Sequence, residues 1–574
     1  MNNWERIKNG LVFSFKGGIY PNEHKNTQVY HTKSIPIPEK LTIPLKMHSG
    51  APGDVIVKVG EHVLAYQPLT QSTSRMSVPI HAPYSGIIEE IGPMPIAHPS
   101  GLKETCIVIK TDPKNEQEMY YNISYSTYER EEPETLLTHI KNMGIAGLGG
   151  AGFPTEVKLR SSTGGDNPCQ VLIINGAECE PYITCDDRLM CERSDEIISG
   201  IKILQHILKP KFTVIAIEEN KQNAINLISE AITAQKCLNT RVTSIPVKYP
   251  SGAARNLIKL ITGVEVPYDA RSSAYGAVVH NVSTVHAVYR AVVLGKPLVK
   301  RIVTITGEAI EHIGNYLIPL GTSIYDILKI CNYRVPKNPR IIVGGPMMGF
   351  TLPNAHVPIT KTTNCIIAPS DEELKRIKPQ VDCIRCGRCA KVCPSRLIPY
   401  ELYTSCLANN DKQCLKNGIK SCIECGCCSY VCPSAIRLVE AFRTQKTIMK
   451  AQKKKEEKLK IAKERYQAKL VKIKLEEELR AKRKAEALAK AKAMQEKKKA
   501  MAKAQETSTQ VNSASEGTNA NSEANKPKES STVKQNLENQ TKEMKVQDKD
   551  LNKVENKPTN ETTKPQENIQ GDNQ

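Results

Sequence analysis

The chain has 574 residues, 19 cysteines and a formal net charge of +20, so it is too long for one hydrophobic core and we expect three or more domains. The excess of positive charge lies mainly in one segment, residues 443–505, with 23 Lys and Arg against 8 Asp and Glu. Because the charge is confined to this segment, we do not predict a nucleic-acid partner from it. No apolar run approaches the roughly 20 residues that span a bilayer, and no apolar leader precedes the first domain, so we expect a cytosolic or peripheral protein.

Residues 1–125 are predicted to form a β-rich N-terminal domain. Its apolar or alternating runs are separated by Gly, Pro and Asp, as short strands are, and they span residues 41–45, 55–59 and 86–91. The phrases that begin at Val59 and His81 resemble those of lipoyl and biotinyl carrier domains, which fold as barrel sandwiches. Those carriers hold a modified lysine between the two phrases. Residues 72–77 contain no lysine, so we predict this fold without the prosthetic group.

A glycine-rich segment follows a predicted helix at residues 133–143. Residues 147–152 fit G-x-G-x-x-G, but a dinucleotide fingerprint must follow a strand, so we do not assign one. Glycines lack a Cβ and let backbone N–H groups approach an anion, and Lys158 adds a positive charge nearby. The segment therefore predicts an anion site, with a flexible loop as the alternative.

Residues 126–295 are predicted to form an α/β domain. Buried-type strands at residues 171–174 and 212–217 alternate with a helix at residues 222–235, which favours parallel strands. Polar residues follow the first strand directly, where such folds bind ligands, and they include Asn175, Glu178 and Glu180.

Residues 296–365 return to short strands and predict a small β-grasp-like module. Its strands are expected at residues 301–306 and 341–344, with a short helix at residues 325–331 between them. Residues 344–349 form a second glycine-rich turn.

Two cysteine runs begin at Cys383 and Cys422, within residues 366–442. Each fits C-x2-C-x2-C-x3-C-P, the spacing that holds [4Fe–4S] clusters in ferredoxins. The fourth cysteine of such a run ligates the other cluster in two-cluster proteins. We therefore assign the first cluster to Cys383, Cys386, Cys389 and Cys432, and the second cluster to Cys422, Cys425, Cys428 and Cys393.

Zinc sites and disulfides are the alternatives for these cysteines. Zinc usually takes two C-x2-C pairs across a longer loop, which fits the runs poorly, and disulfides are rare in a reducing compartment. Helical spacing at residues 400–407 predicts a helical two-cluster ferredoxin module. Cys406, Cys414 and Cys427 fall outside the pattern and are expected to be small buried thiols.

The end of the chain is rich in charge and poor in apolar residues. Residues 436–505 contain no Gly or Pro and are dominated by Ala, Lys, Glu, Leu and Arg, which predicts one long solvated helix. Residues 506–574 are rich in Asn, Ser, Thr and Gln and are expected to be disordered.

With these motifs in place, the chain resembles the RnfC/RsxC family of the Rnf/Rsx ion-translocating electron-transport complex over residues 10–450. Besides the two cysteine runs, the resemblance rests on Phe15-Lys-Gly-Gly-Ile19, Gly149-Gly-Ala-Gly-Phe-Pro-Thr155, Tyr249-Pro-Ser-Gly252, Gly344-Gly-Pro-Met-Met-Gly349 and Thr363-Asn-Cys365. It implies a barrel-sandwich-like domain at 1–125, a flavin and NADH domain at 126–295, an SLBB-like β-grasp module at 296–365, a ferredoxin module at 366–442, a basic helix at 443–505 and a tail at 506–574.

The central domain is in turn similar to the flavin subunit of respiratory complex I. The resemblance implies flavin contacts from Gly149, Gly150, Gly152, Phe153, Lys158, Asn175, Glu178 and Glu180. The chain departs from that family at three positions: Leu148 replaces an arginine, Ala177 an aspartate and Cys179 a glycine.

The resemblance implies a peripheral electron-transfer protein on the cytoplasmic side of an inner membrane. Electrons would pass between NAD(H), FMN, two [4Fe–4S] clusters and the other subunits, including a ferredoxin-like carrier, to drive ion transport. Two alternatives stay open at this stage. One is a soluble flavin and iron–sulfur NADH diaphorase with no membrane partner, and the other is a scaffold whose clusters are structural.

Overall fold

The computed structural model describes residues 3–113, 119–163, 168–374 and 379–508. The chain divides into two compact units, Met1–Ile461 and Ala462–Gln574. None of the described helices is both long enough and apolar enough to cross a membrane. The predicted disordered tail lies outside the described residues from residue 509 onward.

The N-terminal domain has a four-stranded antiparallel sheet in the order β2-β7-β6-β4. Its strands are β2 (Lys40–Pro44), β4 (His62–Val63), β6 (Gly86–Pro95) and β7 (Lys103–Thr111), beside a pair formed by β3 (Asp54–Val55) and β5 (Thr70–Gln71). The predicted strands at 41–45 and 86–91 are confirmed. The strand predicted at 55–59 is wrong beyond Val55, because Lys58 and Glu61 close a turn there: the Glu61 amide donates to the Lys58 carbonyl, and the Lys58 amide donates to the Glu61 carboxylate.

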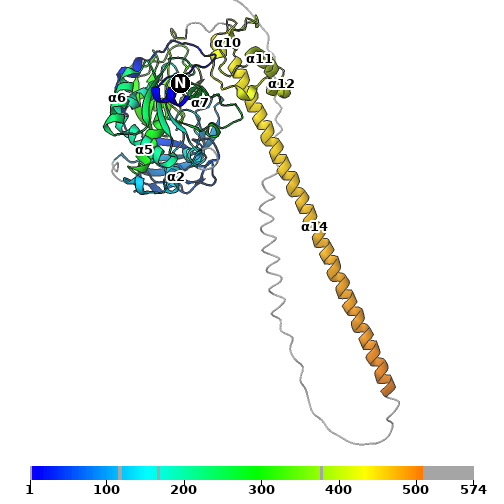
Figure 1. Cartoon of the computed structure of the whole chain (residues 1–574). Helices are drawn as coiled ribbons and strands as arrows, with labels where there is room; N and C mark the ends of the chain where they lie inside the picture. The colour runs from blue at the N-terminus through cyan, green and yellow to red at the C-terminus, as the bar shows by residue number, and fades with distance from the viewer. Residues whose placement is uncertain (1–2, 114–118, 164–167, 375–378, 509–574) are drawn as a thin grey trace, which may run out of the picture. The chain divides into compact units, whose positions relative to one another are not determined.

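The central α/β domain is built on a parallel sheet in the order β10-β9-β8-β11. The strands are β8 (Val171–Gly176), β9 (Phe212–Glu218), β10 (Thr240–Ile245) and β11 (Ala277–Asn281). The helices are α2 (Pro133–Asn142), α3 (Thr155–Arg160), α4 (Cys185–Glu192), α5 (Ser194–Leu208), α6 (Gln222–Ala234), α7 (Ala254–Thr262) and α8 (Val282–Val292). The predicted helices at 133–143 and 222–235 are confirmed as α2 and α6 (Figure 1). The predicted parallel strands are also confirmed.

Helices cover both faces of this sheet. Leu172 and Ile174 of β8 point into the core formed with α2, α5, α6 and α8, whereas Val171 and Ile173 point into the core formed with α7 and the N-terminal helix α1 (Asn3–Asn9). A strand buried on both faces has no polar alternation, which is why the sequence shows continuous apolar runs here. The carboxyl ends of the strands remain free for a ligand site.

A six-stranded sheet follows, in the order β1-β13-β12-β16-β14-β15. Its strands are β1 (Lys33–Ser34), β12 (Lys300–Thr306), β13 (Gly314–Pro319), β14 (Ile342–Val343), β15 (Phe350–Thr351) and β16 (Cys365–Ile367), with helix α9 (Ile324–Ile330). Strand β1 reaches this sheet from the N-terminal region and pairs parallel with β13. One hydrophobic core contains Leu41 and Ile109 together with Val303 and Ile366, so the N-terminal region and this module share their interior. The predicted domain boundaries and the β-grasp assignment stay predictions.

The cysteine region is helical, as the sequence predicts. It contains α10 (Arg388–Lys391), α11 (Pro399–Leu407), α12 (Asp411–Lys416) and α13 (Cys427–Tyr430). Each run turns on a glycine with positive φ, Gly387 at 73° and Gly426 at 78°, directly before a short helix. The thiols of Cys406, Cys414 and Cys427 are buried, which confirms the prediction.

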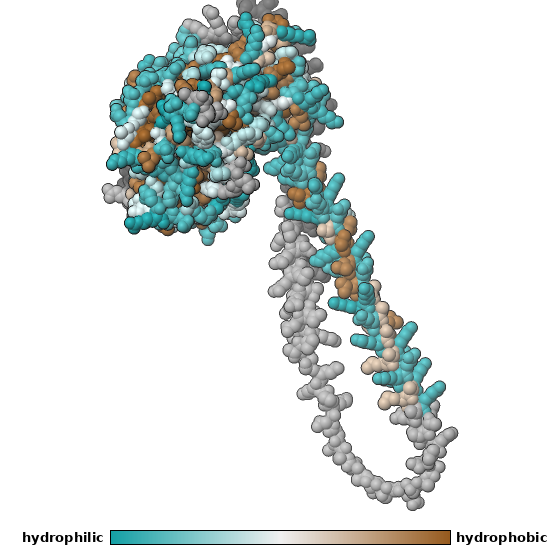
Figure 2. Space-filling model, viewed as in Figure 1, coloured by the Kyte–Doolittle hydropathy of each residue, from teal (hydrophilic) through white to brown (hydrophobic). Residues whose placement is uncertain are grey.

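Helix α14 (Leu438–Ser508) has 71 residues and confirms the predicted long helix. From residue 450 to residue 503 every side chain is exposed. Most of these side chains are hydrophilic, with scattered apolar ones between them (Figure 2). Lys, Ala and Glu favour helix without requiring a partner surface, so intrinsic propensity accounts for this segment.

Candidate functional site

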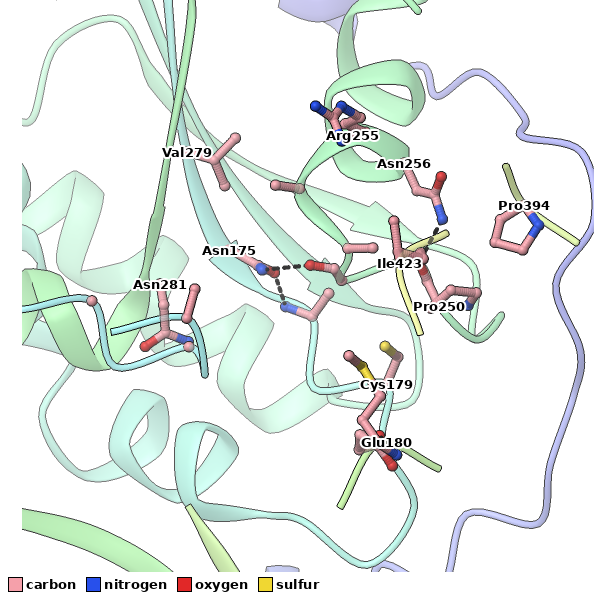
Figure 3. Close-up of a pocket in the computed structure, with 18 of the residues that line it drawn as sticks. Asn175, Cys179, Glu180, Pro250, Arg255, Asn256, Val279, Asn281, Pro394 and Ile423 are labelled. Atoms are coloured by element: carbon pink, nitrogen blue, oxygen red, sulfur yellow. Dashed lines mark hydrogen bonds between the residues drawn. The ribbon is translucent and has the colours of Figure 1, made fainter. Parts of the chain in front are cut away.

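A cavity of about 670 Å³ opens at the carboxyl ends of strands β8 and β11. Its lining comes from the glycine loop, from the segment after β8, from the start of α7 and from the end of β11 (Figure 3). Cavities of this size hold cofactor-sized ligands. The position agrees with the general placement of ligands in open α/β sheets.

Six of the eight predicted flavin residues line this cavity: Gly149, Phe153, Lys158, Asn175, Glu178 and Glu180. Gly150 and Gly152 are not among its lining residues in the described part of the chain. A Cβ on Gly150 would meet nothing within 4 Å, whereas a Cβ on Gly152 would approach Thr362 and His48. Of these three glycines, Gly149 lines the cavity, and a Cβ there would lie 3.1 Å from the Asn281 Cβ.

Lys158 lies on α3 and supplies a positive charge on the cavity wall. Its Nζ donates to the Val279 carbonyl at 2.9 Å, which fixes the side chain against β11. Burial lowers the pKa of Lys158 to about 8, and burial together with the nearby Lys158 lowers the pKa of His280. His280 is therefore neutral at pH 7, and Lys158 remains mostly protonated beside it.

Asn175 is the second-last residue of strand β8, and its side chain joins two loops by hydrogen bonds. Its Nδ2 donates to the Gly252 carbonyl at 3.0 Å, and its Oδ1 accepts from the Ala177 amide at 3.1 Å (Figure 3). Gly252 is required for this approach, since a Cβ there would lie 2.8 Å from the Ala177 carbonyl oxygen. The motif Tyr249-Pro-Ser-Gly252 thus shapes the cavity wall opposite the glycine loop.

Glu178 caps a helix inside the site. Its carboxylate accepts from the Asp186 amide at 2.8 Å and from the Asp187 amide at 3.4 Å, at the start of α4. These amides would otherwise lack partners, and a helix N-terminus attracts negative charge. Burial nevertheless raises the pKa of Glu178 to about 7. The carboxylate is consequently committed to the protein and is not a free ligand group.

Glu180 links the cavity to the second cysteine run. It accepts from the Met348 amide at 2.8 Å and from the Met347 amide at 3.2 Å, in the turn at residues 344–349. Tyr249 lies beside it and donates to the Cys425 carbonyl at 2.7 Å. A Cβ on Gly345 would collide with the Glu180 carboxylate, which explains the glycine there. Burial raises the pKa of Glu180 to about 7.

Lys25 holds the segment after β8, and the sequence alone does not single it out. Its Nζ donates to the carbonyls of Glu178, Glu180 and Ile183 at 2.7, 2.8 and 2.6 Å. Lys25 lies more than 150 residues before these partners, and no local pattern marks it. Tyr249 likewise has no predicted role of its own, although its motif contributes to the family resemblance.

The eight predicted cluster cysteines surround two small cavities. One is lined by Cys383, Cys386, Cys389 and Cys432, and the other by Cys393, Cys422, Cys425 and Cys428. Each set draws three cysteines from one run and one from the other. Across the described residues no group of three or more His, Cys, Asp or Glu side chains is arranged to hold a single metal ion. Thiolates spread around a cavity suit a cubane, in which each iron takes its own cysteine.

The 670 Å³ cavity is larger than the two cysteine cavities, and we call it the larger cavity. It borders the second cysteine cavity directly. Pro394, Ser395 and Ile423 line both. The motif at residues 15–19 packs against the same place: the Gly18 amide donates to the Val392 carbonyl at 2.9 Å, and a Cβ on Gly17 would lie 2.7 Å from the Cys393 carbonyl. The cysteine module and the α/β domain are thus joined at the cavity.

The donor set of the larger cavity suits a phosphate-bearing cofactor. Lys16, Lys158, Arg255 and Lys259 supply positive charge, and the glycine loop supplies backbone amides. Phe153 and Tyr268 add aromatic surface.

Two family models define the class of protein to which these domains belong. Residues 13–114 match the RnfC barrel sandwich hybrid domain, and residues 140–290 match the Nuo51 FMN-binding domain. The predicted barrel-sandwich fold and the predicted likeness to the complex I flavin subunit are confirmed by these matches.

Curated relatives then specify the family. Proteins named as the C subunit of the ion-translocating oxidoreductase complex are 47% identical over 421 residues in Vibrio cholerae serotype O1, 45% over 468 in Pectobacterium atrosepticum and 44% over 467 in Yersinia pestis bv. Antiqua. The alignments cover 72, 81 and 81% of this chain and 53, 66 and 74% of those relatives. The chain thus spans about half the length of the Vibrio relative. It belongs to this family, the C subunits of ion-translocating oxidoreductase complexes.

Solved structures with partial likeness include an NAD+-reducing [NiFe]-hydrogenase in two states. The H2-reduced state shares 16% identity at a TM-score of 0.42, covering 56% of this chain and 64% of that chain. The air-oxidised state shares 17% identity at a TM-score of 0.38, covering 48% and 53%.

Proposed function

We propose that this chain is the peripheral electron-transfer subunit of an ion-translocating oxidoreductase, at the cytoplasmic face of an inner membrane. FMN would occupy the 670 Å³ cavity, and two [4Fe–4S] clusters would occupy the two cysteine cavities in the crossed arrangement. Flavin exchanges electrons with NAD(H) in pairs and clusters exchange them singly, which joins NAD(H) to one-electron carriers in the other subunits.

The observation that carries this proposal is the wall shared by the larger cavity and the second cysteine cavity. Pro394, Ser395 and Ile423 belong to both, so no domain separates the two cofactor positions. Tyr249 reinforces the junction through the Cys425 carbonyl. The second cluster would therefore be the partner of the flavin.

The first cluster would serve as the exit toward other subunits. Cys383 and Cys386 are exposed, whereas Cys425 and Cys428 are buried. A carrier protein, ferredoxin-like in its own chemistry, can approach the exposed pair without entering the α/β domain.

The residues of the cavity have separable tasks in this proposal. Lys158 and the glycine loop would hold the flavin phosphate, with Gly149 as the position of close approach. Asn175 and Lys25 shape the wall through their hydrogen bonds to loop carbonyls. Glu178 holds the start of α4 in place by accepting from the Asp186 amide.

Anaerobic reconstitution of the whole chain with iron, sulfide and FMN tests the proposal. About eight irons and one FMN per chain are expected. NADH should bleach both the flavin and the cluster absorbance. A chain that retains no flavin, or whose clusters stay oxidised when NADH reduces the flavin, would contradict the proposed function.

A further inference from the structure

A second large cavity, of about 830 Å³, lies on the other side of the glycine loop. We call it the lysine groove. Its walls come from Pro44 and residues 46–50, from Ile96, Ala97 and Glu104, from the glycine loop at Ala151 and Gly152, from Thr360 and Thr362, and from residues between 450 and 457 of α14. Ala151 lines both the lysine groove and the cavity proposed to hold flavin. The lysine groove is thus adjacent to the proposed flavin site but separate from it.

The lysine groove is positively charged. Lys46 enters from the N-terminal domain, and Lys450, Lys453 and Lys454 enter from α14, against Glu104 and Glu457. None of these four lysines forms an ion pair within the part of the chain that the structure describes. All four side chains are exposed, so an anion in the groove would be within reach of positive charge from two distant segments.

Polar groups on the floor of the groove add a second indication of a ligand. His48 is buried, 6% exposed, and its Nδ1 has no hydrogen-bond partner among the described residues. Thr360 and Thr362 carry hydroxyl groups at the same wall. A buried polar atom without a partner is costly, and His48 places such an atom in a side chain that lines the groove.

Two hydrogen bonds from Ser49 connect the groove to the glycine loop. The Ser49 amide donates to the Gly152 carbonyl at 2.8 Å, and the Ser49 hydroxyl donates to the Ala151 carbonyl at 2.6 Å. Gly152 packs against Thr362 and His48 from the groove side. This placement accounts for a glycine of the loop that does not line the larger cavity.

We propose that the lysine groove is a binding site for a phosphate-bearing ligand with at least two negative charges. Its volume is within the range of cofactor-sized pockets, and its charges and hydroxyl groups are those that bind phosphate oxygens. The ligand stabilises the clamp between Ser49 and the glycine loop. The same chemistry is offered by a free phosphate compound and by an anionic lipid headgroup.

Inorganic pyrophosphate is the probe that tests the site, by calorimetry on the whole chain at low and at moderate salt. Wild-type protein should bind it. The variant Lys450→Ala/Lys453→Ala/Lys454→Ala should weaken binding at least about tenfold, because charge-assisted contacts to phosphate are lost. Lys46→Ala should weaken it as well, although this residue lies on another element. The matched control Lys482→Ala/Lys484→Ala/Lys490→Ala removes equal charge from the same helix outside the groove and should change affinity less than about twofold.

Vesicles distinguish the two sources of phosphate. Displacement of pyrophosphate by phosphatidylglycerol vesicles, but not by phosphatidylcholine vesicles, would identify a lipid headgroup as the occupant. Failure of both vesicle types to displace it would identify a free phosphate compound. The proposal is overturned if wild-type protein binds no pyrophosphate, if Lys46→Ala binds as wild type does, or if the control triple variant weakens binding as much as the groove variant.

Discussion

Replacing Lys25 by methionine should loosen the segment that forms one wall of the larger cavity. Methionine keeps the length of the side chain but removes the ammonium that donates to the carbonyls of Glu178, Glu180 and Ile183. Three carbonyls then lose a charged donor at once. Burial lowers the pKa of Lys25, so holding this charge already costs free energy, and the loss is smaller than the sum of three isolated bonds.

A bond to a charged group contributes about 1.5–3 kcal/mol, and the cost of burying the Lys25 ammonium offsets part of the sum of three such bonds. We therefore expect the free energy of unfolding to fall by about 3 kcal/mol, within the range for removing a buried polar partner. Urea unfolding followed by circular dichroism measures this loss, and gel filtration of the reconstituted protein measures flavin retention. Lys40→Met is the matched control, because Lys40 pairs with Glu89 on the exposed surface.

The control should leave both measurements unchanged. Lys25→Met should lower the urea midpoint and release flavin. An unchanged midpoint together with full flavin retention would refute the assignment of Lys25 as the residue that holds this wall.

Three further changes test the glycine loop, the buried Glu178 carboxyl group and the basic helix. Gly149→Val should abolish flavin retention in gel filtration. A Cβ added at this position would lie 3.1 Å from the Asn281 Cβ, and the branched side chain would press on Asn281. Full retention of flavin would count against the site. Burial raises the pKa of Glu178 to about 7 from its ordinary value of 4.5. Between these two pH values the native state keeps a proton that the unfolded state releases. The contribution of Glu178 to the free energy of unfolding therefore falls as pH rises from about 4.5 to 7, by up to about 3 kcal/mol. Glu178→Gln should flatten that decline in urea midpoints, and an identical decline in the variant would show that another group causes it. Truncation after Ile461 should leave iron and flavin contents unchanged and reduce retention of the protein on anionic vesicles at low salt. Each basic residue near such a surface contributes about 1 kcal/mol to the free energy of binding. Equal retention of the full-length and truncated proteins across a salt series would indicate that the helix is only a spacer.

The sequence predicts those features that depend on local pattern. Strands β8 and β9 are continuous apolar runs, and the spacing within the cysteine runs is visible without any structure. The same spacing predicts the crossed assignment of the fourth cysteines, which stays a prediction beside the observed grouping of the eight cysteines around two cavities.

Features that depend on pairing between distant segments were not predictable. Strand β1 has two residues and exists because it pairs with β13, nearly 300 residues later. Lys25 and Tyr249 acquire their roles from carbonyls on other domains. Gly152 lines the lysine groove and Gly149 lines the 670 Å³ cavity, a distinction that the spacing of glycines along one loop does not reveal.

In the proposed function, electrons pass between FMN in the 670 Å³ cavity and the first cluster by way of the second cluster. The double variant Cys425→Ala/Cys428→Ala removes two of the four cysteines around the second cavity and spares the set around the first. Stopped-flow spectroscopy with NADH, on variant protein verified to hold about four irons and one flavin, measures the consequence. NADH should still bleach the flavin while the first cluster stays oxidised. Reduction of the first cluster at the wild-type rate would contradict it.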